Sequence, residues 1–272
     1  MSSAVAAACG VVALSALTVP AAHADERFGD TDITGVVVND GNPVVVGTGA
    51  RTVTAEVTAT DPSGLQQVNA TLYHGPFGAP DSTVASTAAC GPTVATTTTC
   101  TLTFTLTPGT APADDSLAGD WHLSAYAIAP DSDAVFLDSA ATVSVLRDSQ
   151  VSVDATPKPV KWGRVLTVTG GVRNADWATG TFAGAEAGRP VSLQFRPKGS
   201  STYCTLKTVP TAAGGTLSTT VRAYTDGSYR WSYAGTGGPP GAGGGGPRRG
   251  GGGGGSVEAG GGGGARGRGA RR

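Results

Sequence analysis

The residues in this sequence best suited to chemistry are aspartates placed where strands are expected to end, namely Asp30, Asp32, Asp61, Asp114, Asp115, Asp120, Asp131 and Asp133. Calcium takes about six to eight oxygen ligands, which carboxylates gathered at one end of a β-structure can supply. The metal-ligand candidates that we single out are Asp30, Asp32, Asp131 and Asp133. A D-x-D-x-D-G loop with a closing Glu is absent from the sequence, and Asp131-Ser132-Asp133 is equally expected of a polar turn. Acidic loops that keep the protein soluble are the competing interpretation.

Catalytic chemistry finds little support in the sequence. Two histidines follow residue 24, and one of them, His122, alternates away from the Trp121 face and is expected to be solvated. The block Asp115-Ser116-Leu117 resembles the nucleophile block of some lipases, but Asp114 replaces the preceding Gly and no partner His motif follows. The glycines near the C-terminus lack the Lys and Ser/Thr of a phosphate-binding loop. We therefore expect no enzyme activity and no cofactor apart from the calcium considered above.

Residues 1–24 have the composition of an export signal. They contain no charged residue, are apolar from Ala4 to Val19, and end in Ala22-His23-Ala24. This pattern predicts a signal peptide cleaved after Ala24, although the usual basic residues at its start are missing. The apolar run is too short for a comfortable membrane span. We expect a secreted, extracellular protein with no membrane span once the signal is removed.

Three cysteines remain after this signal. Cys90 and Cys100 lie at the ends of two expected strands joined by a polar loop, which predicts a disulfide, and an exported protein meets an oxidising compartment. A metal site built on this pair would need CxxC spacing or a nearby His, and neither is present. Cys204 shares an expected strand face with Leu206, which predicts a buried, inert thiol, with intermolecular pairing as the alternative.

Short alternating segments fill the rest of the chain and predict an all-β protein of two tandem immunoglobulin-like antiparallel β-sandwiches. The first is expected over residues 25–148 and the second over 149–236, because the chain turns polar and gains prolines near residue 149. In the second part, the segment Arg173 to Gly188 carries Trp177 and Phe182 and is expected to fold over one end of the core. Expected strands of the first part are Thr34 to Asn39, Val44 to Gly47, Arg51 to Thr60, Val68 to His74, Thr101 to Thr107, Trp121 to Ala129 and Ala141 to Arg147.

Charge is distributed unevenly between these parts. Residues 25–147 hold 14 acidic residues against 3 Arg, a net charge of -11, whereas residues 148–236 hold 10 basic against 5 acidic residues, a net charge of +5. Such fields affect partners and solubility rather than fold. A solvated surface is the simplest interpretation of the basic part. The alternatives for the partner are an anionic cell-wall polymer bound through the second domain and another extracellular protein.

Several segments of the sequence resemble the two domains of a group of secreted actinomycete proteins. Those domains are classed as being of unknown function. The resemblance runs from about Ala22 to Thr236, implies immunoglobulin-like domains, and brings no established activity or ligand residues, although some members are labelled calcium-binding. It is carried in the first part by Gly29-Asp30-Thr31 to Val46-Gly47, the turn Asp61-Pro62-Ser63-Gly64 with the strand before it, and Cys90 and Cys100, and in the second by Pro157 to Gly170, Val191 to Phe195, Gly199 to Tyr203 and Trp231 to Thr236.

The likeness ends at Thr236. Residues 237–272 consist almost wholly of Gly, Pro, Ala and Arg, each of which has codons that begin with two G or C bases, as a frameshift in a GC-rich gene would produce. An Arg-Gly tail for nucleic acid is the alternative, but no aromatic residue is interleaved for stacking, so we expect no specific nucleic-acid binding. We expect this tail to be disordered and the second domain to lack its last strand.

Two functions therefore follow from the sequence. The first is a non-catalytic, secreted interaction or structural module of unknown specificity. The second is a calcium-binding secreted protein, and binding of an anionic wall polymer is a further alternative.

Overall fold

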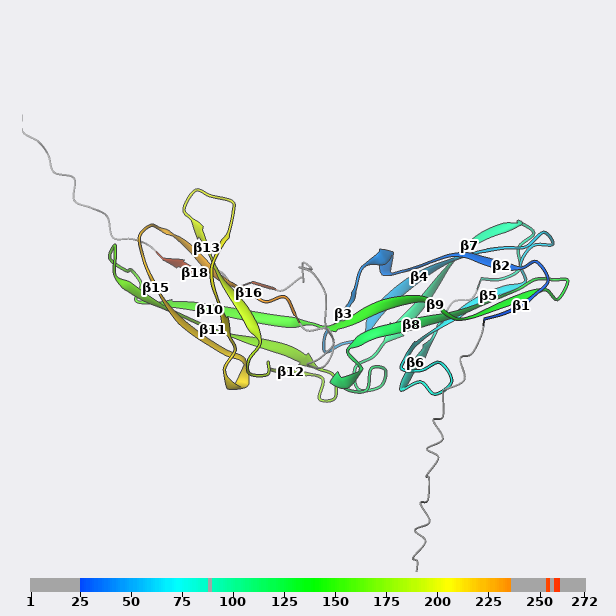
Figure 1. Ribbon diagram of the computed structural model, residues 1–272, viewed down its shortest axis with the longest axis horizontal. Coiled ribbons are helices and arrows are strands. Elements are labelled where there is room, and N and C mark those ends of the chain that lie inside the picture. The colour runs from blue at the N-terminus through cyan, green and yellow to red at the C-terminus, as the bar shows by residue number, and fades with distance from the viewer. Residues whose placement is uncertain (1–24, 88–89, 236–252, 255–256, 260–272) are drawn as a thin grey trace, which may run out of the picture.

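The computed structural model describes residues 25–87 and 90–235, together with the backbone of two short strands at 253–254 and 257–259. The predicted signal peptide and most of the Gly/Arg-rich tail lie outside the described residues. The described chain is all-β, since its only helices are three single 3-10 turns, η1 (Asn39–Gly41), η2 (Asp115–Leu117) and η3 (Ala213–Gly215). The strands of residues 25–147 (β1–β9) lie together at the right of Figure 1, and most of the later strands lie together at its left, end to end along the long axis.

The N-terminal half, residues 25–147, forms two sheets whose inner side chains share one hydrophobic cluster. One sheet has the order β1-β9-β8-β5-β6, with β3 added parallel to β9, and the other has the order β2-β4-β7. The strands are β1 (Glu26–Phe28), β2 (Asp32–Val38), β3 (Val44–Val46), β4 (Arg51–Thr60), β5 (Gln67–His74), β6 (Ser82–Ala85), β7 (Thr97–Leu106), β8 (Gly119–Ile128) and β9 (Ala134–Arg147).

The alternation seen in the sequence determines which side of each strand is buried. In β4, the small apolar residues from Val53 to Ala59 are buried while the intervening Thr and Glu side chains face outward. In β8, Trp121 and the alternate residues that follow it are buried in the same cluster. The expected turn after β4 is present, because the Gly64 amide donates to the Asp61 carbonyl at 3.1 Å and Gly64 has a φ of +90°.

The strand prediction missed β1, β6 and the first half of β9. All three residues of β1 are exposed, and β6 lies at a sheet edge with no buried residue, so neither leaves an apolar pattern in the sequence. The pairing of β8 with β9 shifts register between Leu123 and Ala125, and this irregularity interrupts the alternation of β9. Strands that do not fill a core carry a weak sequence signal.

The predicted disulfide is confirmed. Cys90 and Cys100 are bonded, with their Cα atoms 5.6 Å apart. Cys100 lies on β7 opposite Val57 of β4, whereas Cys90 forms an isolated backbone β-bridge with Val68 of β5. The bond therefore links the two sheets of the N-terminal half.

The C-terminal half, residues 148–235, repeats this scheme around a second cluster. One of its sheets has the order β12-β11-β10-β17, with β15 also paired to β11, and the other has the order β14-β13-β16-β18. The strands are β10 (Ser149–Thr156), β11 (Val165–Asp176), β12 (Thr181–Gly184), β13 (Pro190–Pro197), β14 (Cys204–Pro210), β15 (Thr216–Arg222), β16 (Gly227–Ser232), β17 (Gly253–Gly254) and β18 (Val257–Ala259).

The prediction that Cys204 is buried was wrong. Its strand, β14, is the edge of its sheet, and Val209 is the residue of that strand that packs against the second cluster. Cys204 is an exposed free thiol, and Leu206 is also exposed. Alternation on a strand implies a buried face only where a second layer covers that face, and none covers this part of β14.

The segment Arg173 to Gly188 was expected to fold over one end of the second core, and Ala185 is buried there, but its aromatic residues Trp177 and Phe182 pack against the cluster of the N-terminal half. It completes β11 and adds β12, and Trp177 between them is buried in the cluster of the N-terminal half. The Trp177 indole donates to the Val46 carbonyl at 3.2 Å, and its amide donates to Asp115 at 2.8 Å. Trp177 therefore joins the two halves instead of covering the second core.

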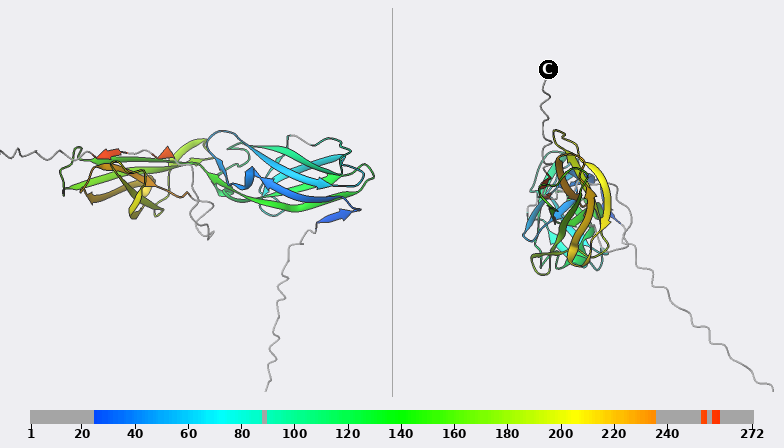
Figure 2. Two further views of the ribbon diagram at one scale, coloured as in Figure 1. Left: turned by 90° about the horizontal axis from the view of Figure 1, so that it is seen from above. Right: turned by 90° about the vertical axis from the view of Figure 1, so that its left-hand side faces the viewer.

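Two short pieces of the C-terminal tail are strands. β18 pairs antiparallel with β16, and β17 pairs parallel with β10 (Figure 2). For these five residues the structure differs from a disordered tail, and β18 occupies part of the β16 edge where we expected no partner strand. Among the described residues, no helix has the length and apolar character needed to cross a bilayer.

Candidate metal centre

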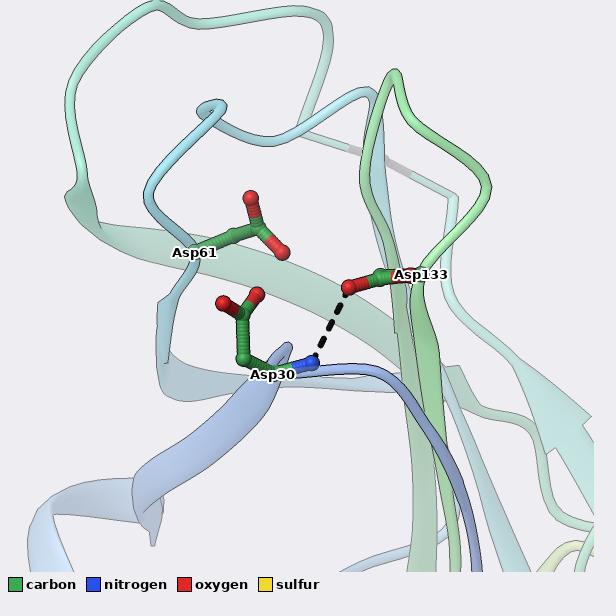
Figure 3. Close-up of side chains that lie close together, drawn as sticks. All are labelled: Asp30, Asp61 and Asp133. Atoms are coloured by element: carbon green, nitrogen blue, oxygen red, sulfur yellow. Dashed lines mark hydrogen bonds between the residues drawn. The ribbon is translucent and has the colours of Figure 1, made fainter.

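Three aspartates from separate loops meet at one end of the N-terminal half. Asp30 follows β1, Asp61 follows β4, and Asp133 lies in the turn between β8 and β9. One carboxylate oxygen from each lies within 4.8 Å of the other two. Figure 3 shows the three side chains directed toward a common point, with the Asp30 amide donating to Asp133 at 3.0 Å. We call these three residues the aspartate triad.

A glycine allows Asp133 to approach Asp30. Gly29 has a φ of +73°, which favours glycine, and a Cβ placed on it would lie 1.8 Å from the carboxyl carbon of Asp133. The Asp133 loop is itself closed by the Ala129 amide, which donates to the Asp133 carbonyl at 2.8 Å. Any side chain at position 29 would therefore displace the Asp133 carboxylate from the triad.

Asp61 is the fixed member of the triad, because it is buried and hydrogen-bonded on both oxygens. Ser63 donates to Oδ1 through its amide at 2.7 Å and its hydroxyl at 2.6 Å, while the Thr31 hydroxyl donates to Oδ2 at 2.6 Å. Oδ1 thus uses both of its lone pairs on Ser63, whereas Oδ2 accepts one hydrogen bond and keeps a second lone pair free to bind a cation. Asp133 is half-buried and Asp30 is exposed, so the triad opens to solvent on the Asp30 side.

The charges of the triad act on one another. The pKa of Asp30 is raised because neighbouring protein displaces water from its carboxyl and because Asp61, Asp133 and Asp131 carry like charge. Burial also acts to raise the pKa of Asp61, but the hydrogen bonds from Ser63 and Thr31 outweigh it, so that pKa is lowered. Asp61 is therefore held ionised, and the repulsion within the triad acts mainly on Asp30, where it raises the pKa.

This geometry suits a hard divalent cation. Oxygens bound to Ca2+ lie about 2.3 to 2.6 Å from the ion, so two ligands on opposite sides of it are about 5 Å apart. The triad oxygens fall within that limit. A bound cation would also offset the mutual repulsion that raises the pKa of Asp30.

Two of the four candidates singled out from the sequence, Asp30 and Asp133, belong to the triad. Asp32 instead pairs with Arg27, and Asp131 accepts a hydrogen bond from the Asp133 amide at 3.3 Å. Asp61 stood only in the wider group of acidic residues, because the turn sequence around it gives no sign of the distant loops that it meets.

The remaining aspartates of that wider group have structural partners elsewhere. Asp114 caps η2 by accepting from the amide and hydroxyl of Ser116. Asp115 pairs with Arg147 at 2.8 Å, and Asp120 accepts from Ser144 at 2.9 Å. These aspartates are not brought together with the triad.

The two histidines of the described chain are held by neighbouring polar side chains. His74 lies 3.0 Å from Asp81. His122 is half-buried rather than solvated, because its Nδ1 lies 3.2 Å from the hydroxyls of Ser139 and Thr142, and its ring contacts Tyr73. The sequence did not signal this placement, since the residues around His122 come from β5 and β9.

Comparison with known proteins assigns no family. No protein-family model and no curated protein matches the chain. Among solved structures, the crystal structure of dimeric latent PorU from Porphyromonas gingivalis aligns with 74% of this chain and 18% of that chain, at 15% identity and a TM-score of 0.26. The chain thus spans less than a fifth of that protein's length, and a likeness of this degree carries no argument about fold or function.

Proposed function

We propose that this protein is a non-catalytic, secreted interaction or structural module of two tandem immunoglobulin-like sandwiches, whose N-terminal half binds a structural calcium ion. The observation that carries the calcium site is the convergence of Asp30, Asp61 and Asp133 from three loops. Secretion rests on the composition of residues 1–24 and on the disulfide.

The tandem arrangement is supported by the way side chains gather. The inner faces of β2, β4 and β7 share one cluster with those of β5, β8 and β9, as two packed layers would. A separate cluster lies between the sheets of residues 148–235. The antiparallel pairing within each sheet is typical of immunoglobulin-like sandwiches.

The calcium role is structural because the triad ties the first residues of the described chain to two later turns. Asp30 lies between β1 and β2, whereas Asp61 and Asp133 end strands of different sheets. An ion shared by these loops would hold both sheets together at the end remote from the C-terminal half. A ligand that binds only the folded state stabilises that state.

Thermal unfolding of the full chain, with calcium and then with chelator, tests this proposal. We expect calcium to raise the unfolding midpoint, and we expect Asp133→Asn to abolish the shift, since Asp133 is one of the three charged ligands. The matched control is Asp40→Asn, which removes an exposed carboxylate from the same half at a left-handed position that Asn tolerates. This control should keep the full shift.

The proposal fails if calcium leaves the midpoint of the unaltered chain unchanged. It also fails if Asp133→Asn and Asp40→Asn respond to calcium equally, because the ion would then act on general acidic charge. A shift that magnesium reproduces at equal concentration would contradict a calcium-selective site.

A further inference from the structure

The end of the molecule remote from the triad carries two exposed aromatic residues in contact. Trp162 lies between β10 and β11, and Tyr224 lies between β15 and β16; both connections are at the left end of Figure 1. Their ring centroids are 5.5 Å apart in an edge-to-face arrangement. Trp162 is 76% exposed and Tyr224 57% exposed, and Val165 beside them is also exposed. Grouped apolar exposure of this kind marks an interaction surface.

The two aromatic rings stand on a fixed base. The Gly163 amide donates to the Ala223 carbonyl at 2.6 Å, and the Ala223 amide donates to the Arg164 carbonyl at 3.0 Å. The Arg222 guanidinium adds a hydrogen bond to the Gly163 carbonyl at 3.1 Å. Ala223 is itself buried in the second cluster, so the backbone that carries the two rings is already ordered. Binding through these rings would therefore cost little conformational entropy of the backbone.

Positive charge surrounds the aromatic pair. Lys161 and Arg164 are exposed on either side of Trp162, and Arg222 is exposed beside Tyr224. Residues 154–165 and 222–227 together hold four basic residues, the fourth being Lys158, against Asp154 and Asp226, a net charge of +2. Lys158 pairs with Asp154, so the excess charge belongs to the segment that carries the rings.

We propose that this aromatic and basic tip docks on the surface of an anionic lipid bilayer. Trp and Tyr favour the interface between lipid headgroups and water, where an apolar ring and a polar edge are both satisfied. Lys and Arg near such a surface are attracted by anionic headgroups. The exposed rings lie on two adjacent connections at the end of the molecule, where a flat surface can reach them. This proposal is independent of the calcium site, which lies in the other half.

Trp162 gives the experiment its own reporter. Of the four tryptophans, Trp121, Trp177 and Trp231 are each at most 2% exposed, so acrylamide in solution reaches Trp162 first. We expect the full chain to co-sediment with vesicles of equimolar phosphatidylglycerol and phosphatidylcholine but not with phosphatidylcholine alone. Bound vesicles should protect Trp162 from quenching and shift its emission to shorter wavelength.

Variants test whether vesicle binding depends on this tip or is nonspecific. Trp162→Ala combined with Tyr224→Ala should abolish sedimentation, and Lys161→Gln should weaken it about fivefold, as expected for one cation near an anionic surface. Phe28→Ala is the matched control, because Phe28 is 54% exposed in the other half. It should bind vesicles as the unaltered chain does. Circular dichroism of each variant checks that it is folded.

Three results would overturn the proposal. They are equal binding to neutral vesicles, unchanged binding of the folded double variant, and no binding to anionic vesicles at low salt. Retention on a soluble anionic wall polymer without vesicle binding would assign the tip to that polymer instead.

Discussion

The two halves of this molecule use similar sheets but differ in how much they bury. The N-terminal cluster contains 27 buried hydrophobic residues and is linked by a disulfide, whereas the C-terminal cluster contains 12. Two members of the larger cluster, Ala175 and Trp177, come from the C-terminal half. Trp177, the most deeply buried aromatic residue of the C-terminal half, thus packs in the cluster of the N-terminal half. We infer that its stability depends on docking to the larger half.

Ion pairs reinforce this dependence. Arg147, the last residue of β9, donates to the Ala175 carbonyl at 2.6 Å and pairs with Asp115 at 2.8 Å and Glu186 at 3.6 Å. Its side chain is largely buried between residues of both halves. Separating the two halves would leave this largely buried guanidinium without its partners in the C-terminal half, and breaking a buried ion pair is strongly destabilising.

The largest effect should come from Trp177→Ala. This change removes an indole that is 1% exposed, and large aromatic truncations in a core cost about 3 to 5 kcal/mol of unfolding free energy. Trp162→Ala is the matched control, since it removes the same side chain from an exposed site and should change stability by no more than about 0.5 kcal/mol. Denaturant unfolding followed by circular dichroism measures both. Equal losses would refute the docking role of Trp177.

A smaller effect is expected from removing the disulfide. Replacing Cys90 and Cys100 together by Ala should lower the unfolding free energy by about 2 to 3 kcal/mol, because the bond limits the unfolded chain. Cys204→Ala, which alters an exposed thiol, should have no measurable effect. Monitoring proteolysis of each variant tests where the loss occurs: new cleavage sites should appear first in residues 25–147. First cleavage in the C-terminal half would contradict the assignment.

The smallest effect concerns pH. In chelator, the raised pKa of Asp30 means that its ionised form opposes folding, and this penalty is relieved as pH falls through that pKa. The lowered pKa of Asp61 has the opposite sign, since its stabilisation is present above its unfolded value and is lost only at lower pH. Calcium requires ionised ligands, so the calcium-induced midpoint shift should shrink on acidification before the Asp61 stabilisation is lost.

Calorimetry of calcium binding at several pH values checks this order. Asp30→Asn should raise the stability of the chelated protein and reduce calcium binding together. If the calcium affinity stays constant as the pH is lowered to the ordinary pKa of an aspartate, Asp30 is not a ligand.

The sequence predicted most of the strands that fill the N-terminal core, and little of what joins them. Alternation identified β4 and β8 and their buried faces because both strands have one covered side. The same rule failed at Cys204, where an edge strand has no covering layer. Periodicity reports the local pattern of a strand, whereas burial depends on what the fold places against it.

Long-range contacts explain the remaining differences. Trp177 packs beside Val46, which is 131 residues earlier, and no local pattern indicates that contact. In the triad, the sequence pointed to acidic turns but did not show that Asp61 meets Asp30 and Asp133. Their meeting depends on which strand ends share one end of the sheets.

A crystal structure of the full chain grown with calcium tests the central claim most directly. We expect an ion between Asp30, Asp61 and Asp133, with carboxylate oxygens about 2.3 to 2.6 Å away and anomalous signal for calcium. Water alone at that position, or calcium bound elsewhere with the triad unchanged, would contradict it.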